Sequence, residues 1–301
     1  MTATHAGAGA LGLELDRQRP SAWSNFLHIA RTKYLGTASA IVLIFFFGLA
    51  AFAPVLAPYD PIEVNTNVSL QAPSAAHLLG TDELGRDLLS RVMYGAQVSL
   101  MVGLTSVLLG VVFGVFLGIT SAYFGGFYDL VVQRLIDSLQ AFPSLILALV
   151  LVATLGSSVQ NVIFAIAITL IATKARVVRS AALSLMQNQY VDGARVIGCK
   201  SPYIMVKYIV PNAWAVIIVL FSLSIGQAII REASLSFLGL GPPPPTPTWG
   251  GMLSGSARSY MSTAPWLALA PGMCIMLVVL AFNLLGDTVR DVLDPRLRGT
   301  N

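Results

Sequence analysis

Residues 92–128 read VMYGAQVSLMVGLTSVLLGVVFGVFLGITSAYFGGFY, a run of 37 residues without a single charged side chain. A helix of about 20 mostly apolar residues is enough to cross the hydrocarbon core of a bilayer. Four more uncharged runs occur along the chain, at residues 34–59, 138–173, 208–230 and 259–286. This pattern predicts an all-α, polytopic membrane protein.

The composition of the whole chain supports the same class. Of its 301 residues, 55% are apolar and 11% are charged, against about 25% charged in an average soluble domain. So few charges cannot cover the surface of a soluble protein of this size. Soluble, disordered and disulfide-rich secreted classes are therefore excluded. Three distant histidines and two cysteines offer no metal-ligand spacing.

We expect six membrane spans. Their approximate limits are Tyr34–Leu56, Gln97–Ala122, Leu130–Leu155, Val159–Thr173, Ala213–Ile230 and Pro265–Leu285. The third and fourth share one uncharged run, which Gly156-Ser157-Ser158 divides. The alternative for this run is one span with a re-entrant piece, which gives five. Ala51-Phe52-Ala53 resembles a signal-peptide cleavage site, but a long polar leader precedes the run, and we expect a retained anchor.

The basic residues predict the orientation. With six spans and an inner N-terminus, 14 of the 18 basic residues fall in inner segments, which places both termini in the cytoplasm. The expected organisation is a cytoplasmic segment at 1–33, the first span and outer loop at 34–96, the main transmembrane domain at 97–287, and a cytoplasmic tail at 288–301. This bias explains the net charge of +4, so no nucleic-acid partner is needed.

One glycine pattern lies within the second span. Gly110, Gly114 and Gly118 recur every fourth residue and so share one helix face, where another helix can approach closely. We interpret them as packing inside the bundle; contact with a second subunit is the alternative.

The inner loop at 174–211 is too long for a simple connector and carries a net charge of +5. Its composition predicts a helix over Ala181–Val196 that stops at Gly198. A second helix is expected to begin at Ser201-Pro202 and to reach the membrane boundary at Pro211.

This loop has no ATP site of its own. The spacing of Gly193 and Gly198 matches a phosphate-binding loop, but Cys199 stands where that loop needs lysine, and no strand precedes it. We also expect no ionisable residue at the middle of any span, so ion coupling would lack its usual groups. Energy for uphill transport would then come from a partner that binds the basic loop.

Four separated motifs carry a resemblance to a known family. Tyr190–Gly198, followed by Val210-Pro211-Asn212, resembles the EAA loop of bacterial ATP-binding-cassette (ABC) importer permeases, with Asp192 in place of Glu and Gly193 in place of the first Ala. Residues 79–91, 232–250 and 282–296 are similar to segments of the dipeptide/oligopeptide/nickel branch. The resemblance covers about residues 25–298 and points to the second, C-type permease of a pair.

The resemblance implies the type I importer permease fold with six transmembrane helices, in the cytoplasmic (inner) membrane of a bacterium or archaeon. It also implies that the inner loop docks on an ATPase, through the coupling residues Asp192, Gly193, Ala194, Gly198 and Pro211. Asp192 would pair with a cation of the ATPase, Ala194 would permit close approach, and Gly198 would shape the turn. The alternative for Asp192 is local neutralisation by Arg195.

The partners implied are a second homologous permease subunit, one or two cytoplasmic subunits that bind the ATP, an extracytoplasmic substrate-binding protein and the lipid bilayer. Short peptides are the expected cargo, with nickel, glutathione or another small solute as alternatives. The outer segments 57–96 and 233–264 would dock the binding protein, and Pro242–Pro245 would form a stiff polyproline segment or a rigid lid.

Two other classes have less support. A stand-alone secondary transporter needs ionisable groups within its spans, and a membrane enzyme needs a convergent catalytic set; we find neither. Substrate-pathway residues remain unassigned, since polar span residues such as Ser224, Gln227 and Asn283 more often bond neighbouring helices.

Overall fold

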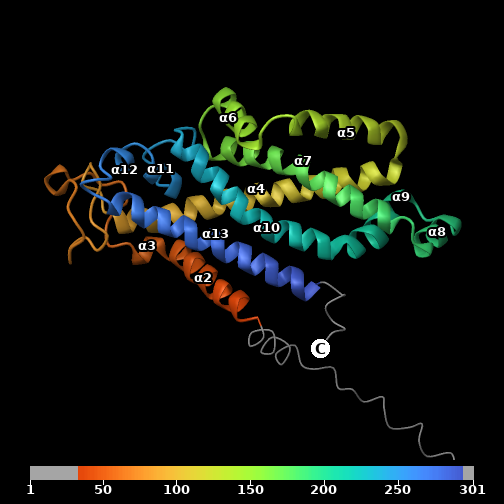
Figure 1. The fold of residues 1–301 in the computed structure, drawn as a ribbon, viewed down its shortest axis with the longest axis horizontal. Coiled ribbons are helices and arrows are strands. Elements are labelled where there is room, and N and C mark those ends of the chain that lie inside the picture. Colours follow the sequence, from red (N-terminus) through yellow and green to blue (C-terminus); the bar gives the residue numbers. More distant parts are fainter. Residues whose placement is uncertain (1–32, 294–301) are drawn as a thin grey trace, which may run out of the picture.

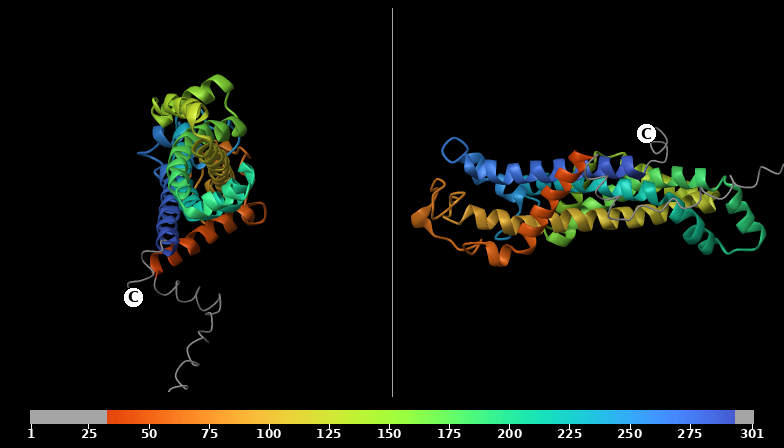
Figure 2. Two further views of the ribbon diagram at one scale, coloured as in Figure 1. Left: turned by 90° about the vertical axis from the view of Figure 1, so that its right-hand side faces the viewer. Right: turned by 90° about the horizontal axis from the view of Figure 1, so that it is seen from below.

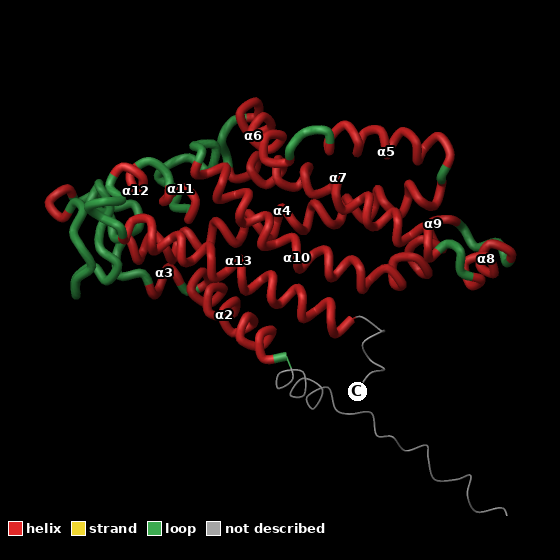
Figure 3. The backbone as a smooth tube through the Cα atoms, viewed as in Figure 1, coloured by secondary structure: helices red, strands yellow, loops and turns green. Residues whose placement is uncertain are grey.

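The computed structural model describes residues 33–293, and every regular element in that range is a helix (Figures 1 and 3). Five helices are long and apolar enough to cross a membrane: α2 (Tyr34–Ala51), α4 (Leu88–Phe124), α7 (Val159–Leu185), α10 (Val210–Phe237) and α13 (Trp266–Leu293). They lie side by side in an elongated bundle (Figure 2).

Shorter elements connect these helices. They are α3 (Ala53–Leu56), the 3-10 turn η1 (Thr66–Val68), α5 (Gly126–Gln140), α6 (Ser144–Leu155), α8 (Gln189–Val196), α9 (Ser201–Ile204), the π-helical turn η2 (Met205–Ile209), α11 (Trp249–Leu253) and α12 (Ser256–Ser259). The connections at 57–87 and 238–264 gather at one end of the bundle and the α8–α9 hairpin lies at the other (Figure 1).

The glycine stripe packs α4 along α7 within one chain. A Cβ added to Gly110 would lie 2.6 Å from the Leu170 Cβ, and one added to Gly114 would lie 2.7 Å from the Lys174 Cβ. At Gly118 the added atom would be 2.6 Å from the Ala175 carbonyl oxygen. The predicted packing role is confirmed. Residue numbers rise together on both sides, so α4 and α7 run parallel.

Because α4 and α7 are parallel, the chain between them must return across the bundle. That return is made by α5 and α6, which are bent by 89° to each other. α5 runs antiparallel to the inner half of α7, where the Gln140 side chain donates to the Ala172 carbonyl at 2.8 Å. The pair thus provides the sixth crossing, and the described chain needs no re-entrant piece.

The expected third span is interrupted where a single helix was predicted. The helix breaks at residues 141–143, between α5 and α6, because Pro143 has no N–H to donate to the preceding turn. The predicted division after Leu155 is confirmed. There Gly156 has a φ of +89°, and the Ser158 hydroxyl caps α7 by accepting from the Asn161 N–H at 3.1 Å.

Two helices run further than the expected spans. α7 continues past Thr173 to Leu185, and α10 continues past Ile230 to Phe237. Lys174, Arg231 and Glu232 therefore lie inside membrane-crossing helices, beyond the limits expected for the spans. The expected loop 174–211 is correspondingly helical at both ends.

The two ends of the described chain meet. The Lys33 ammonium lies 2.6 Å from an Asp291 carboxylate oxygen, and Gly36 packs against Thr288. Ends on one side require an even number of crossings, in agreement with six. Residues 1–32 and 294–301, which hold nearly all of the expected N-terminal segment and part of the expected tail, lie outside the described residues.

Candidate docking hairpin and outer cap

The hairpin formed by α8 and α9 projects at one end of the bundle (Figure 1). Val191 and Ala194 are the inward side chains of α8 and are buried against Ile204 and Ile209. α4 and α7 complete this small core through Ile119 and Val178, among others. The hairpin is therefore fixed to the two helices that cross the membrane beside it.

Gly198 follows the end of α8 as predicted, but the expected helix Ala181–Val196 is divided at residues 186–188 between α7 and α8. The Gly198 φ of +80° lies in the left-handed region, which costs a residue with a Cβ about 1–2 kcal/mol. The Cys199 N–H donates to the Ala194 carbonyl and the Gly198 N–H to the Arg195 carbonyl, both at 3.0 Å. These two bonds form the Schellman arrangement that satisfies the last carbonyls of a helix.

Pro211 sits in a helix that continues through it rather than at a helix start. α9, η2 and α10 follow one another without interruption from Ser201 to Phe237. Proline cannot donate to the preceding turn and its ring crowds that turn. The π-helical turn Met205–Ile209 lies immediately before Pro211 and widens the backbone there, which lets the helix pass.

The hairpin exposes large apolar side chains beside charged residues such as Arg195 and Lys200. We call these apolar side chains the hairpin patch: Tyr190, Val196, Ile197, Tyr203 and Val206. Val196 is 86% exposed and Ile197 is 76% exposed. A cluster of this kind on a water-facing end marks a protein–protein contact, because water disfavours exposed apolar groups.

The predicted coupling residues divide into two groups. Asp192 and Gly193 are exposed, and an added Cβ at Gly193 would meet nothing within 4 Å. The Asp192 carboxylate accepts from Arg195 at 3.1 Å, so the local ion pair forms in this chain. Arg195 also lies over the Tyr123 ring at 5.6 Å. Ala194 is buried in the hairpin core, where its small side chain admits Ile204, rather than facing outward.

The opposite end carries what we call the outer cap, residues 57–87 and 238–264. Asp82 accepts from the Arg86 side chain at 2.6 Å and from the Leu84 and Arg86 N–H groups at 2.9 Å. Arg91 lies 3.5 Å from the same carboxylate. Asp87 instead caps α4 and bonds His77 at 3.0 Å. These ion pairs join the outer loop to the first turn of α4, since Arg91 lies on that helix.

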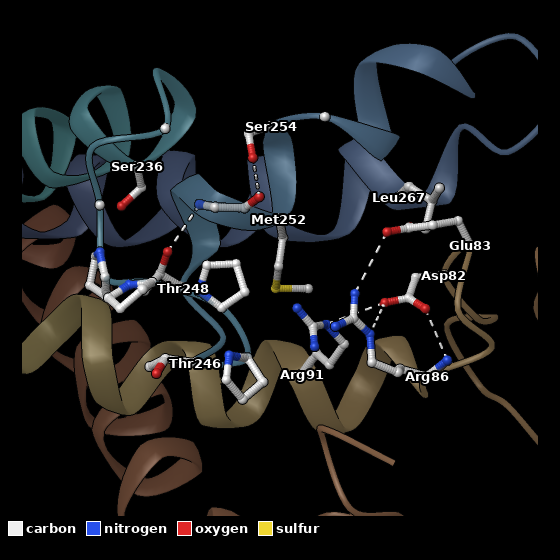
Figure 4. Close-up of a pocket in the computed structure, with 18 of the residues that line it drawn as sticks. Asp82, Glu83, Arg86, Arg91, Ser236, Thr246, Thr248, Met252, Ser254 and Leu267 are labelled. Atoms are coloured by element: carbon white, nitrogen blue, oxygen red, sulfur yellow. Dashed lines mark hydrogen bonds and ion pairs between the residues drawn. The ribbon is translucent and has the colours of Figure 1, made fainter. Parts of the chain in front are cut away.

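A cavity of about 420 Å³ lies between this ion cluster and the proline-rich loop (Figure 4). Arg86, Arg91 and Met252 line one side, and Pro242–Pro245 line the other. The Thr246 N–H donates to the Pro243 carbonyl at 3.3 Å, so the prolines turn around the cavity instead of extending. No described group of three acidic, histidine or cysteine side chains is placed to hold a metal ion.

Trp249 anchors the outer cap to the bundle, a role that our sequence analysis did not give it. Trp249 is fully buried and its indole N–H donates to the Val92 carbonyl at 3.0 Å. Gly250 lets α11 press against α10, since an added Cβ would be 2.4 Å from the Ala233 Cα. Glu232 is also fully buried, with one oxygen accepting from Ser236 at 2.7 Å. In the sequence, the Trp249-Gly250 pair after a proline run is the feature that could have indicated this anchor.

Six crossings, an apolar hairpin at one end and a folded cap at the other define a multi-pass membrane permease subunit. Residues 92–299 match the family described as the binding-protein-dependent transport system inner membrane component. Residues 21–73 match the N-terminal transmembrane domain of oligopeptide transport permease C. The chain therefore belongs to the family of inner-membrane permease subunits of ABC importers, and is a transport subunit rather than an enzyme.

Similar proteins cover almost the whole chain. The dipeptide transport system permease protein DppC of Alkalihalophilus pseudofirmus is 42% identical over 278 residues, 92% of this chain and 91% of that protein. The glutathione transport system permease protein GsiD of Pectobacterium atrosepticum is 42% identical over 284 residues, 94% of each chain. GsiD of an Escherichia coli O6:K15:H31 strain is 42% identical over 295 residues, covering 98% and 97%.

Proposed function

We propose that this chain forms half of the translocation pathway of an ATP-driven importer for short peptides. A second homologous permease subunit forms the other half, and an extracytoplasmic binding protein delivers the cargo. Similarity to a dipeptide permease supports peptide cargo. Glutathione, itself a short peptide, is the second candidate because two similar proteins bear its name.

The hairpin patch carries the proposed coupling to ATP. One or two cytoplasmic ATPase subunits, which hold the nucleotide, would cover Val196, Ile197 and Tyr203. Burial of these side chains is worth about 25 cal/mol for each Å² removed from water. The hairpin shares a core with α4 and α7, so its displacement moves two crossings as a rigid body. This placement puts the hairpin and both chain termini in the cytoplasm.

The outer cap is the proposed contact for the binding protein. Its loops are folded before any partner arrives, which lowers the ordering cost of binding. Asp82 and Arg86 are satisfied within the cap, so we assign the docking role to the cap's surface rather than to these two side chains.

The test is co-purification of the ATPase subunits with the assembled importer. Ile197→Glu places a charge in the proposed contact and should reduce the bound ATPase about tenfold or more. Leu78→Glu is the matched control: Leu78 is 63% exposed, but on the outer cap. Equal ATPase recovery from both variants would refute the docking assignment.

A further inference from the structure

Among the described residues, two buried or half-buried cations of the membrane-crossing helices have no anionic partner. Lys174 on α7 is 8% exposed, and Arg231 on α10 is half-buried. Neither takes part in any ion pair among the described residues. The neighbouring cations differ: Arg176 pairs with Asp137 and Arg179 with Asp129. The other described cations without an ion pair, Lys200, Lys207, Arg258 and Arg290, are exposed.

Both groups lie well within the length of their helices. The Arg231 guanidinium donates to the Thr169 hydroxyl at 2.9 Å. Thr169 is ten residues into α7, which at 1.5 Å per residue is about 15 Å from its outer end. Lys174 lies five residues further along α7, a rise of about 7.5 Å from Thr169. Burying like charges together in a span is costly and marks a functional site.

The nearest acid along the chain does not neutralise them. Glu232 follows Arg231, about 100° further round α10, where Ser236 donates to one of its oxygens. Its other carboxylate oxygen is buried and has no hydrogen-bond partner among the described residues. The anion for Lys174 and Arg231 must therefore come from outside the described chain.

Gln227 indicates which side the cations face. It lies one turn before Arg231, is exposed, and makes no hydrogen bond with a described residue. An amide and a guanidinium on one helix face cannot be turned to lipid at this depth. This face of α10 is therefore directed to water or to another protein, as a surface lining a pathway between two permease subunits would be.

We propose that Lys174 and Arg231, with Thr169 and Gln227 beside them, form a cation site that receives a carboxylate of the passing substrate. This rests on the proposed function and narrows its substrate class to peptides with a free carboxylate. The guanidinium can donate two parallel hydrogen bonds to a carboxylate, and the ammonium adds a point charge. A divalent metal cation would be repelled by the same pair, so the site disfavours nickel as cargo.

The test uses the complete importer in proteoliposomes, with its binding protein, and the dipeptide alanyl-alanine as probe. Lys174→Met and Arg231→Met should lower peptide uptake per ATP hydrolysed about tenfold or more. Lys174→Arg and Arg231→Lys keep the charge and should restore most of that ratio. Arg176→Gln, which removes a cation that already has its acid, is the matched control and should keep the wild-type ratio.

The outcomes separate the two proposals. A wild-type importer that carries no peptide from a loaded binding protein overturns the proposed function and this site with it. Peptide transport by the wild type and by both methionine variants at equal efficiency overturns the site alone. So does equal damage from the charge-keeping and charge-removing variants, because that marks a structural role.

A second measurement needs no substitution. The wild-type importer should carry alanyl-alanine about tenfold faster than its C-terminal amide, both at concentrations that saturate the binding protein. Equal rates for the acid and the amide would contradict a carboxylate site.

Discussion

The connecting segments at the two ends of this permease differ in how far their side chains are buried within the chain itself. In the outer cap, the ion cluster around Asp82 is internally satisfied and Trp249 is fully buried. In the hairpin, Val196 and Ile197 lie in water and the Asp192–Arg195 pair is largely exposed. The difference indicates that the outer cap is stable by itself, whereas the hairpin gains much of its stabilisation when a partner covers it.

Removal of the cap's anchor should have the largest effect. Trp249→Ala leaves a cavity beside Gly95 and Phe46 and should destabilise the fold by about 3–5 kcal/mol. Thermal unfolding of the detergent-solubilised importer measures it. Trp214→Ala is the control, since Trp214 is 55% exposed on α10 and should cost far less. Similar melting temperatures for the two variants would contradict the anchoring role.

The same chemical change at each end should give unequal results. Asp82→Asn removes the carboxylate that Arg86 and Arg91 share in a nearly buried cluster. It should lower the free energy of unfolding by about 3 kcal/mol. Asp192→Asn breaks a pair whose carboxylate is 64% exposed and should cost less than about 1 kcal/mol. The midpoints of denaturant unfolding provide the comparison. A larger cost at Asp192 would reverse the contrast between the ends.

Two glycines of the hairpin should respond in opposite directions, with the smallest effects. Gly198→Ala forces a Cβ into the left-handed region and should destabilise the hairpin by about 1–2 kcal/mol. Gly193→Ala lies in a helix with free space around it and should stabilise α8 by up to about 1 kcal/mol. Hydrogen exchange of the α8 amides measures both. Slower exchange in Gly198→Ala would show that the turn needs no glycine.

Much of the fold was predictable because the bilayer imposes it. The uncharged runs predicted the crossings. The glycine and serine residues at 156–158 predicted the division after Leu155, and Gly198 predicted the end of α8. The bend at Pro143 was missed because we predicted one helix wherever an apolar run was long enough to cross the membrane. The proline is visible in the sequence, but whether it kinks or breaks a helix depends on the packing of α5 and α6.

The depths of Lys174 and Arg231 were missed for a related reason. The expected spans stopped at Thr173 and Ile230, which placed both cations at a membrane surface. Helices held by their neighbours continue past the lipid, so the register of one helix against another decides depth. The hydrogen bond from Arg231 to Thr169 fixes the register of α10 against α7. This contact is visible only in the folded structure.

The length of α4 links the movements of the two ends of the molecule. Its 37 residues form an uninterrupted helix about 55 Å long. Asp87 ties its first turn to His77 in the outer cap, and Tyr123 near its last turn carries the Arg195 guanidinium of the hairpin. A continuous helix with a contact at each end can move as a rigid body. A displacement of the hairpin would therefore move the outer cap as well, without side-chain rearrangements in between.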